Sequence, residues 1–193
     1  MPDETVRAYA FKEPGPHNTE KTLKAAIERA QELGIRYIVV ASVGGNTALQ
    51  AKSLYEQLKY QGKLIVVTQH AGWAEAGRLQ LGEETRKRLR ETGCEVVTST
   101  HALSGISRSF RQEFGGIDLP EVVAEAFRRF SQGVKASIES AIMAADAGVV
   151  PIDEDIVAVA GSGEGADSAL VIRTASQNRF FDLKVREVIA MPR

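Results

Sequence analysis

Short apolar runs alternate along the chain with segments in which apolar residues recur every three or four positions. The run at residues 35–41 is continuous rather than alternating, which is typical of a strand covered on both faces. Leu23, Ala26, Ile27 and Ala30 follow helical spacing instead. Applied to the whole chain, these patterns predict strands at 35–41, 64–68, 94–98, 156–160 and 169–174, and helices at 19–34, 47–62, 83–92 and 120–148.

The order of these elements favours an α/β domain with three layers, helix, sheet and helix. Strands that alternate with helices pair in parallel through right-handed crossovers, which place helices on both faces of the sheet. The glycine-rich segment 161–167 joins strand to strand, so we expect the last of the five strands to be antiparallel to its neighbour. The helix at 120–148 has an interruption at Gly133, and residues 185–191 form a short last strand or a tail. We expect one domain over residues 1–193.

Composition excludes several classes of protein. The chain has 193 residues and a formal net charge of -1, so no overall positive field attracts nucleic acid or an anionic membrane. Its single cysteine, Cys94, rules out an internal disulfide, and the three scattered histidines show no zinc-ligand spacing. With no apolar leader and no run long enough for a membrane span, we expect a cytoplasmic protein that takes a small-molecule ligand.

Four predicted loops follow strands and should lie along one edge of the sheet, at residues 42–47, 69–70, 100–101 and 161–167. Ligands of open α/β sheets bind beyond the carboxyl ends of the strands. The candidate binding residues are Ser42, Val43, Gly44, Gly45, Asn46, Thr47, Gln69, His70, Thr100, His101, Gly161, Ser162, Gly163, Gly165, Ala166 and Asp167. Both glycine-rich turns and two of the three histidines therefore converge on one predicted crevice.

The loop at 42–47 has the features of a phosphate site. Its glycines permit close backbone approach, and the helix that follows directs free amides and its positive dipole end at the loop. No lysine follows the glycines, so this is not the ATP-binding P-loop and it implies no magnesium. The alternative interpretation is a tight strand-to-helix turn capped by Asn46 or Thr47.

The turn at 161–167 is not a dinucleotide fingerprint, because its glycine spacing differs and a strand follows where the fingerprint needs a helix. It is interpreted as a flexible turn that faces the first loop and contacts a ligand through its amides and Asp167. The alternative is a plain hairpin.

The side chains that could act on a ligand leave the reaction open. His70 and His101 could orient a ligand or exchange a proton with it, or they could be ordinary hydrogen-bonding histidines. Glu139 and Asp146 share a helical face, where a metal site or a shared proton competes with a solvated face or a helix-end contact. Trp73 is either a platform for a flat ring or an aromatic packed on the core.

Four separated segments carry a family resemblance: residues 41–48, 100–105, 142–146 and 165–169. They resemble stand-alone archaeal and bacterial proteins of the pyruvate kinase α/β-domain-like family. The resemblance implies the fold of the pyruvate kinase C-terminal domain, with a mixed five-stranded sheet of order 3-2-1-4-5 and an antiparallel strand 5. That order places 42–47 beside 161–167.

The resemblance also implies ligands. In pyruvate kinase the loop that is similar to 42–47 holds the phosphate of a sugar effector, and catalysis belongs to a separate barrel for which 193 residues leave no room. We therefore expect no pyruvate kinase activity. Stand-alone members hold flavin mononucleotide (FMN) in the crevice. Because the 42–47 loop lacks a cation, amides, the helix dipole and a remote arginine would meet the charge of the phosphate.

Three functional hypotheses follow. The first is an FMN-binding protein of unknown physiological role, with flavin-dependent oxidoreductase activity as one form of it. The second is a non-catalytic regulatory module that binds a phosphorylated metabolite. The third is a structural subunit that forms a homo-oligomer through the 120–148 helix.

Overall fold

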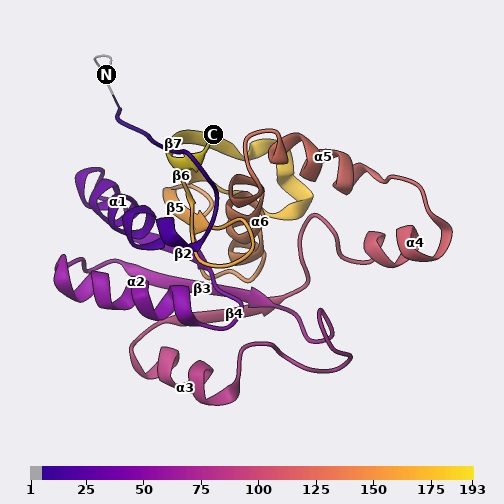
Figure 1. Cartoon of the computed structure of the whole chain (residues 1–193), viewed down its shortest axis with the longest axis horizontal. Coiled ribbons are helices and arrows are strands. Elements are labelled where there is room, and N and C mark those ends of the chain that lie inside the picture. Colours follow the sequence, from indigo (N-terminus) through magenta and orange to yellow (C-terminus); the bar gives the residue numbers. More distant parts are fainter. Residues whose placement is uncertain (1–5) are drawn as a thin grey trace.

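A single mixed sheet of seven strands organises the computed structural model, which describes residues 6–193 (Figure 1). The strands lie in the order β1-β7-β6-β5-β2-β3-β4. Only β6 runs antiparallel to both of its neighbours, and every other pairing is parallel. The strands are β1 (Tyr9–Phe11), β2 (Tyr37–Ala41), β3 (Lys63–Gln69), β4 (Glu95–Ser99), β5 (Asp155–Ala160), β6 (Ser168–Arg173) and β7 (Lys184–Pro192).

The predicted α/β class is confirmed, but the predicted five-stranded sheet is wrong in strand number and in overall order. The strands β4, β3, β2, β5 and β6 lie side by side, with β6 antiparallel to β5, and β7 and β1 extend this sheet beyond β6. The segment left open as a strand or a tail is the nine-residue strand β7. The short strand β1 pairs with β7 in parallel, over only three residues.

Helices cover both faces of the sheet (Figure 1). The apolar side chains of β2 divide between two cores, since Ile38 and Val40 belong to the core beneath α1 and α2, whereas Val39 belongs to the core beneath α6. This division explains why the strand is apolar without alternation. The helices are α1 (Thr19–Glu32), α2 (Asn46–Gln57), α3 (Glu83–Glu91), α4 (Ser107–Phe114), α5 (Leu119–Arg128) and α6 (Gln132–Asp146), with short 3-10 helices η1 (Pro16–Asn18) and η2 (Gln177–Asp182).

The predicted helix at 120–148 is two helices, and the break precedes Gly133. Ser131 is extended and accepts a hydrogen bond from the Val134 amide at 3.0 Å, so it caps the start of α6. Gly133 itself is helical and lies against β6, where a Cβ atom would come within 2.3 Å of Ser168 Oγ. A glycine that looks like a helix breaker in the sequence therefore serves close packing of a helix on the sheet.

The parallel pairing of β2, β3, β4 and β5 brings the carboxyl ends of these strands to one edge. Val40 of β2 pairs with Val66 on one side and with Val159 on the other. The loops after β2, β3 and β4 and the turn after β5 consequently leave the sheet at the same edge.

A buried carboxylate fastens the 161–167 turn to the start of the chain. Asp167 is fully buried, and its Oδ2 accepts hydrogen bonds from the amides of Gly15, at 3.0 Å, and Ser162, at 3.2 Å. Its Oδ1 accepts from Ser168 Oγ at 3.0 Å. The Ala166 amide also donates to Thr19 Oγ1 at 2.9 Å, which ties the turn to the first residue of α1.

We expect Asp167→Asn to lower the free energy of unfolding by about 1–3 kcal/mol, because the amide group replaces one acceptor oxygen with a donor that faces buried amides. Urea denaturation of the purified protein measures the change. Asp153→Asn, at an exposed aspartate, is the matched control and should leave stability unchanged. Equal stability of the two variants would show that Asp167 does not hold the turn.

Candidate functional site

A cavity of about 750 Å³ lies at the carboxyl edge of the parallel strands. Its wall is built from the 42–47 loop, the ends of β3 and β5, the 161–165 turn, the 101–104 segment, and the cavity-facing sides of α4, α5 and α6. Its size falls in the range of small-molecule sites. The predicted convergence of loops is therefore present as one physical space.

Ten of the sixteen predicted residues line this cavity. They are Ser42, Val43, Gly44, Asn46, Thr47, Gln69, His101, Gly161, Gly163 and Gly165. His70 lies on a smaller cavity next to it. The remaining five residues, Gly45, Thr100, Ser162, Ala166 and Asp167, are not on the wall of either cavity.

The 42–47 loop presents the amino end of α2 to the cavity. The Ala48 amide donates to Ser42 Oγ at 3.3 Å, and Thr68 Oγ1 donates to the Val43 carbonyl at 3.2 Å, which ties the loop to β3. The N-cap of α2 is Gly45, which has no side chain, so the alternative interpretation in which Asn46 or Thr47 caps the helix is wrong. The amides of Asn46 and Thr47, at the first two helical positions, have no intrahelical acceptor and remain for a ligand.

Gly44 and Gly45 have different roles in this loop. Gly45 is the N-cap of α2 with φ of 94°, and a Cβ atom there would approach Thr85 Cγ2 at 2.4 Å. Gly45 therefore faces α3 rather than the ligand cavity, which corrects its predicted role. Gly44 lies on the cavity wall, has no positive φ, and would leave an added Cβ in open space.

The 161–167 turn is rigidly held rather than flexible. A Cβ on Gly165 would approach Thr19 Oγ1 at 2.3 Å, and one on Gly161 would approach the Gly165 carbonyl oxygen at 2.4 Å. Ala166 is fully buried, and both carboxylate oxygens of Asp167 are engaged inside the protein. The predicted ligand contacts of Asp167 and Ala166 are therefore corrected, because these residues hold the turn from behind. The turn is a β5–β6 hairpin whose glycines face the cavity.

A buried ion pair on α6 also lines the cavity. Lys135 Nζ lies 2.5 Å from Glu139 Oε2, and the two side chains are only 8% and 5% exposed. Glu139 Oε1 accepts a hydrogen bond from the Leu103 amide at 2.9 Å. The solvated face expected for Glu139 is therefore wrong: this carboxylate positions the segment that carries His101. Asp146 is separate from it and accepts from the Gln177 amide at 3.0 Å.

Three arginines of α4 and α5 add positive charge to the wall of the cavity. Arg111 lies 2.5 Å and Arg128 lies 3.3 Å from the carboxylate of Glu121, so both are paired. Arg108 instead places its guanidinium 4.0 Å from the ring centroid of Trp73. These arginines and Lys135 supply the charge that the 42–47 loop lacks. Sequence reasoning missed Lys135, although a lysine beside the apolar stripe of α6 was an available signal.

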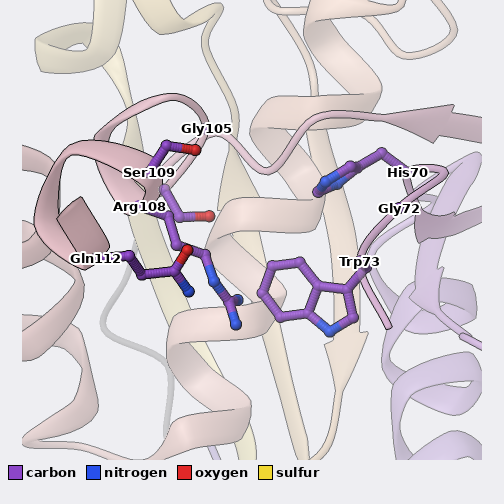
Figure 2. Close-up of a pocket in the computed structure, with 8 residues that line it drawn as sticks. His70, Gly72, Trp73, Gly105, Arg108, Ser109 and Gln112 are labelled. Atoms are coloured by element: carbon purple, nitrogen blue, oxygen red, sulfur yellow. The ribbon is translucent and has the colours of Figure 1, made fainter. Parts of the chain in front are cut away.

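Two imidazoles and an indole cluster where the loops after β3 and β4 meet. The ring centroid of His101 lies 4.4 Å from that of Trp73 and 5.4 Å from that of His70. The Nδ1 atoms of both histidines are buried without a hydrogen-bond partner among the described residues. Figure 2 shows His70 and Trp73 on one side of the smaller cavity, with Arg108 and Gln112 reaching toward them from the other.

The pKa of His101 is lowered from its ordinary value, chiefly because burial disfavours the charged ring. The positive charge of Lys135 acts in the same direction, followed by His70 and Arg108, while Glu139 opposes them. A neutral His101 presents one donor and one acceptor nitrogen to the cavity, rather than two donors.

Residues 6–193 lack two kinds of feature. None of the helices there combines the length and apolar character needed to cross a membrane. Within the same residues, no group of three or more histidine, cysteine, aspartate or glutamate side chains is arranged to hold a metal ion.

Comparison with known proteins gives three results. The family model described as pyruvate kinase, alpha/beta domain, matches residues 20–172. The DegV domain-containing protein BH3627 of Halalkalibacterium halodurans is 33% identical over 99 residues, which cover 48% of this chain and 32% of that protein. The structure of Cryptosporidium parvum pyruvate kinase in complex with ADP matches 89% of this chain and 23% of that chain, with 16% identity and a TM-score of 0.39. The chain spans only a part of the length of each of these two proteins.

We expect Gly45→Ala to destabilise the fold by about 1–3 kcal/mol, because alanine would have to hold a left-handed φ and displace Thr85. Thermal and urea denaturation measure the loss. Gly44→Ala is the matched control, one residue away and in open space, and should be nearly neutral. Thr85→Ser should recover a part of the loss in the Gly45→Ala background, because it removes the clashing methyl group.

The lowered pKa of His101 makes stability depend on pH. The unfolded chain binds a proton more readily than the folded protein, so stability is complete above the unfolded value of about 6.5 and falls as the pH drops toward the folded pKa. His101→Gln should reduce this loss of stability between about pH 7.5 and pH 5.5. Thermal denaturation across that range checks it, with the exposed His17→Gln as control. An NMR titration midpoint of His101 at or above 6.5 would contradict the assignment.

Proposed function

Because the chain belongs to the pyruvate kinase alpha/beta domain family, we propose that it binds a phosphate-bearing small molecule, with FMN as the leading ligand, in the cavity at the carboxyl edge of its sheet. The observation that carries this proposal is the amino end of α2, which opens into that cavity with the Asn46 and Thr47 amides free of hydrogen bonds to other described residues. Such a helix terminus binds phosphate through its free amides and its dipole.

Among the described residues, the cavity wall carries four cationic side chains and three carboxylates (Glu121, Glu139 and Glu164), so a small excess of positive charge supports an anionic group. Lys135 is the most buried cation there, with a side chain only 8% exposed, and it is joined by Arg108, Arg111 and Arg128 on the wall. The amides of Asn46 and Thr47 would hold the phosphate oxygens, and the hydroxyl of Ser42 and the side chain of Thr47, both buried residues on the wall, add neutral donors.

The remainder of the cavity fits a flat ring system. Val43, Val67, Leu103 and Met143 give it apolar surface, and the glycine backbone of the 161–165 turn allows close approach. The buried Gln69 Oε1 and His101 Nδ1 have no partner among the described residues, so they provide acceptors or donors for the polar edge of a ring. Bound there, a flavin would supply hydride or one-electron transfer, with these residues orienting it.

Family membership also favours a second candidate, a regulatory module that binds a phosphorylated metabolite without catalysing a reaction. This candidate needs the 42–47 loop and the surrounding cations but not the histidines. Glu139, the one buried carboxylate that the described residues place on the cavity wall, is paired with Lys135 and bonded to the Leu103 amide, so it is engaged in structure rather than available as a base.

Gly44→Glu tests the phosphate site, because it places a carboxylate in open space where the phosphate would lie. We expect it to weaken FMN binding by more than about tenfold through like-charge repulsion, while Gly44→Gln, of equal length and no charge, weakens it less. Quenching of flavin fluorescence on titration with each protein measures the affinity. Equal FMN affinity of the two variants would show that the phosphate does not bind at this loop.

A thermal-shift panel separates the two candidates. A specific ligand at 100 times its dissociation constant adds about 2.7 kcal/mol of stability. Stabilisation by FMN but not by sugar phosphates supports the flavoprotein, and the reverse supports the regulatory module. If neither class of ligand shifts the transition, the proposal of a phosphate-bearing ligand fails.

A further inference from the structure

A second, smaller cavity of about 200 Å³ adjoins the large one and has its own set of side chains. It lies between the loop after β3 and the start of α4, and its wall includes His70, Trp73, Ser104, Arg108, Ser109 and Gln112 (Figure 2). The 42–47 loop and the 161–165 turn do not border it. Whatever binds here is therefore separate from a phosphate held at the amino end of α2.

Arg108 is the charged group of this cavity. Its guanidinium lies over Trp73, 4.0 Å from the ring centroid, so the indole covers one face of it. Among residues 6–193 it has no carboxylate partner, whereas Arg111 and Arg128 are both paired with Glu121. Stacking leaves the in-plane N–H groups of a guanidinium available, and these form the fork that fits two oxygens of a planar anion.

The neutral groups around Arg108 suit the same ligand. The hydroxyls of Ser104 and Ser109 and the carboxamide of Gln112 lie on the wall and can donate to an oxygen anion. His70 presents its ring from the opposite side, and its buried Nδ1 has no partner among the described residues. Among residues 6–193, no aspartate or glutamate lines this cavity, so none of these residues repels an anion bound there.

We propose that this smaller cavity binds the carboxylate of a small organic acid, with Arg108 holding both carboxylate oxygens and with Trp73 fixing the guanidinium. At about 30 Å³ for each water-sized group, the volume accommodates about six or seven heavy atoms, which matches an acid of two to four carbons. One planar cation with neutral donors suits a singly charged planar group better than a doubly charged phosphate. Since Arg108, Trp73 and Ser104 also border the large cavity, the acid would lie against the ligand held there.

Trp73 provides a direct readout, because it is the single tryptophan of the chain. Titration of the protein alone with acetate, propionate or butyrate, at constant ionic strength, should change its fluorescence saturably for at least one of these acids. Neutral butyramide should give no saturable change. Without added flavin, the outcome does not depend on FMN binding.

Arg108→Gln should weaken binding of the acid by about tenfold or more, because it removes the charge and the fork. Arg108→Lys should fall between this variant and the unmodified protein, since it keeps the charge and loses the paired donors. Arg88→Gln, at an exposed arginine of α3, is the matched control and should bind like the unmodified protein. Dissociation constants are compared, because changes at Arg108 also alter the starting fluorescence of Trp73.

Three results would overturn the assignment: no saturable response to any of the three acids, equal affinity in Arg108→Gln and Arg88→Gln, or tighter binding of inorganic phosphate than of every carboxylate. The phosphate site has its own test in Gly44→Glu. If the protein binds an acid but not FMN, the carboxylate subsite is supported and the flavin proposal fails. If it binds FMN but none of the acids, the flavin proposal is supported and the carboxylate subsite fails.

Discussion

Parallel pairing of β2 with β3 and β5 is the constraint on which the site depends. Val40 lies between Val66 and Val159, so the three strands end at nearly the same height. Each segment that leaves these strands must turn at the same edge, and the sheet places residues more than a hundred positions apart around one cavity. The pairing of the strands thus determines which loops surround the cavity, independently of the side chains that these loops carry.

Buried side chains then hold in place the backbone segments that the sheet brings to this edge. Glu139 on α6 holds the Leu103 amide, and Asp167 holds the Gly15 and Ser162 amides. Both carboxylates are buried and fully engaged in these contacts, so their main role is to position backbone at the edge of the cavity. A buried carboxylate bonded to amides is strongly directional, and removing one would leave several donors unpaired. The cavity wall is therefore set by residues just behind it.

The sequence predicted those features that depend on local pattern. Apolar runs located the five strands around the site, and the strand-end rule brought ten candidate residues to the cavity. Prediction from the sequence failed for strands that are held by contacts between distant residues. The first residues of β7 are exposed, and β1 is too short to show a period. The sequence does not show the burial of Glu139, because its partner Leu103 is 36 positions away. Arg86 lies among the charged residues of α3, where the local pattern shows no sign of burial, yet it is buried and donates to Thr98 Oγ1 at 2.8 Å.

The pairing of β1 with β7 bears on how copies of this chain meet one another. An open outer strand would present a row of unpaired amides and carbonyls, to which a second chain could add itself. Here Tyr9–Phe11 occupies that position on β7, the Arg193 amide donates to the Phe11 carbonyl at 2.9 Å, and the Phe11 side chain is buried. The same stretch of chain continues to Gly15 and its bond with Asp167. β1 is itself the outer strand of the sheet here, and its three residues, paired with 190–192, offer a second chain few unpaired backbone groups. The same short segment therefore shortens the open edge beside the end of β7 and fastens the ligand-facing hairpin.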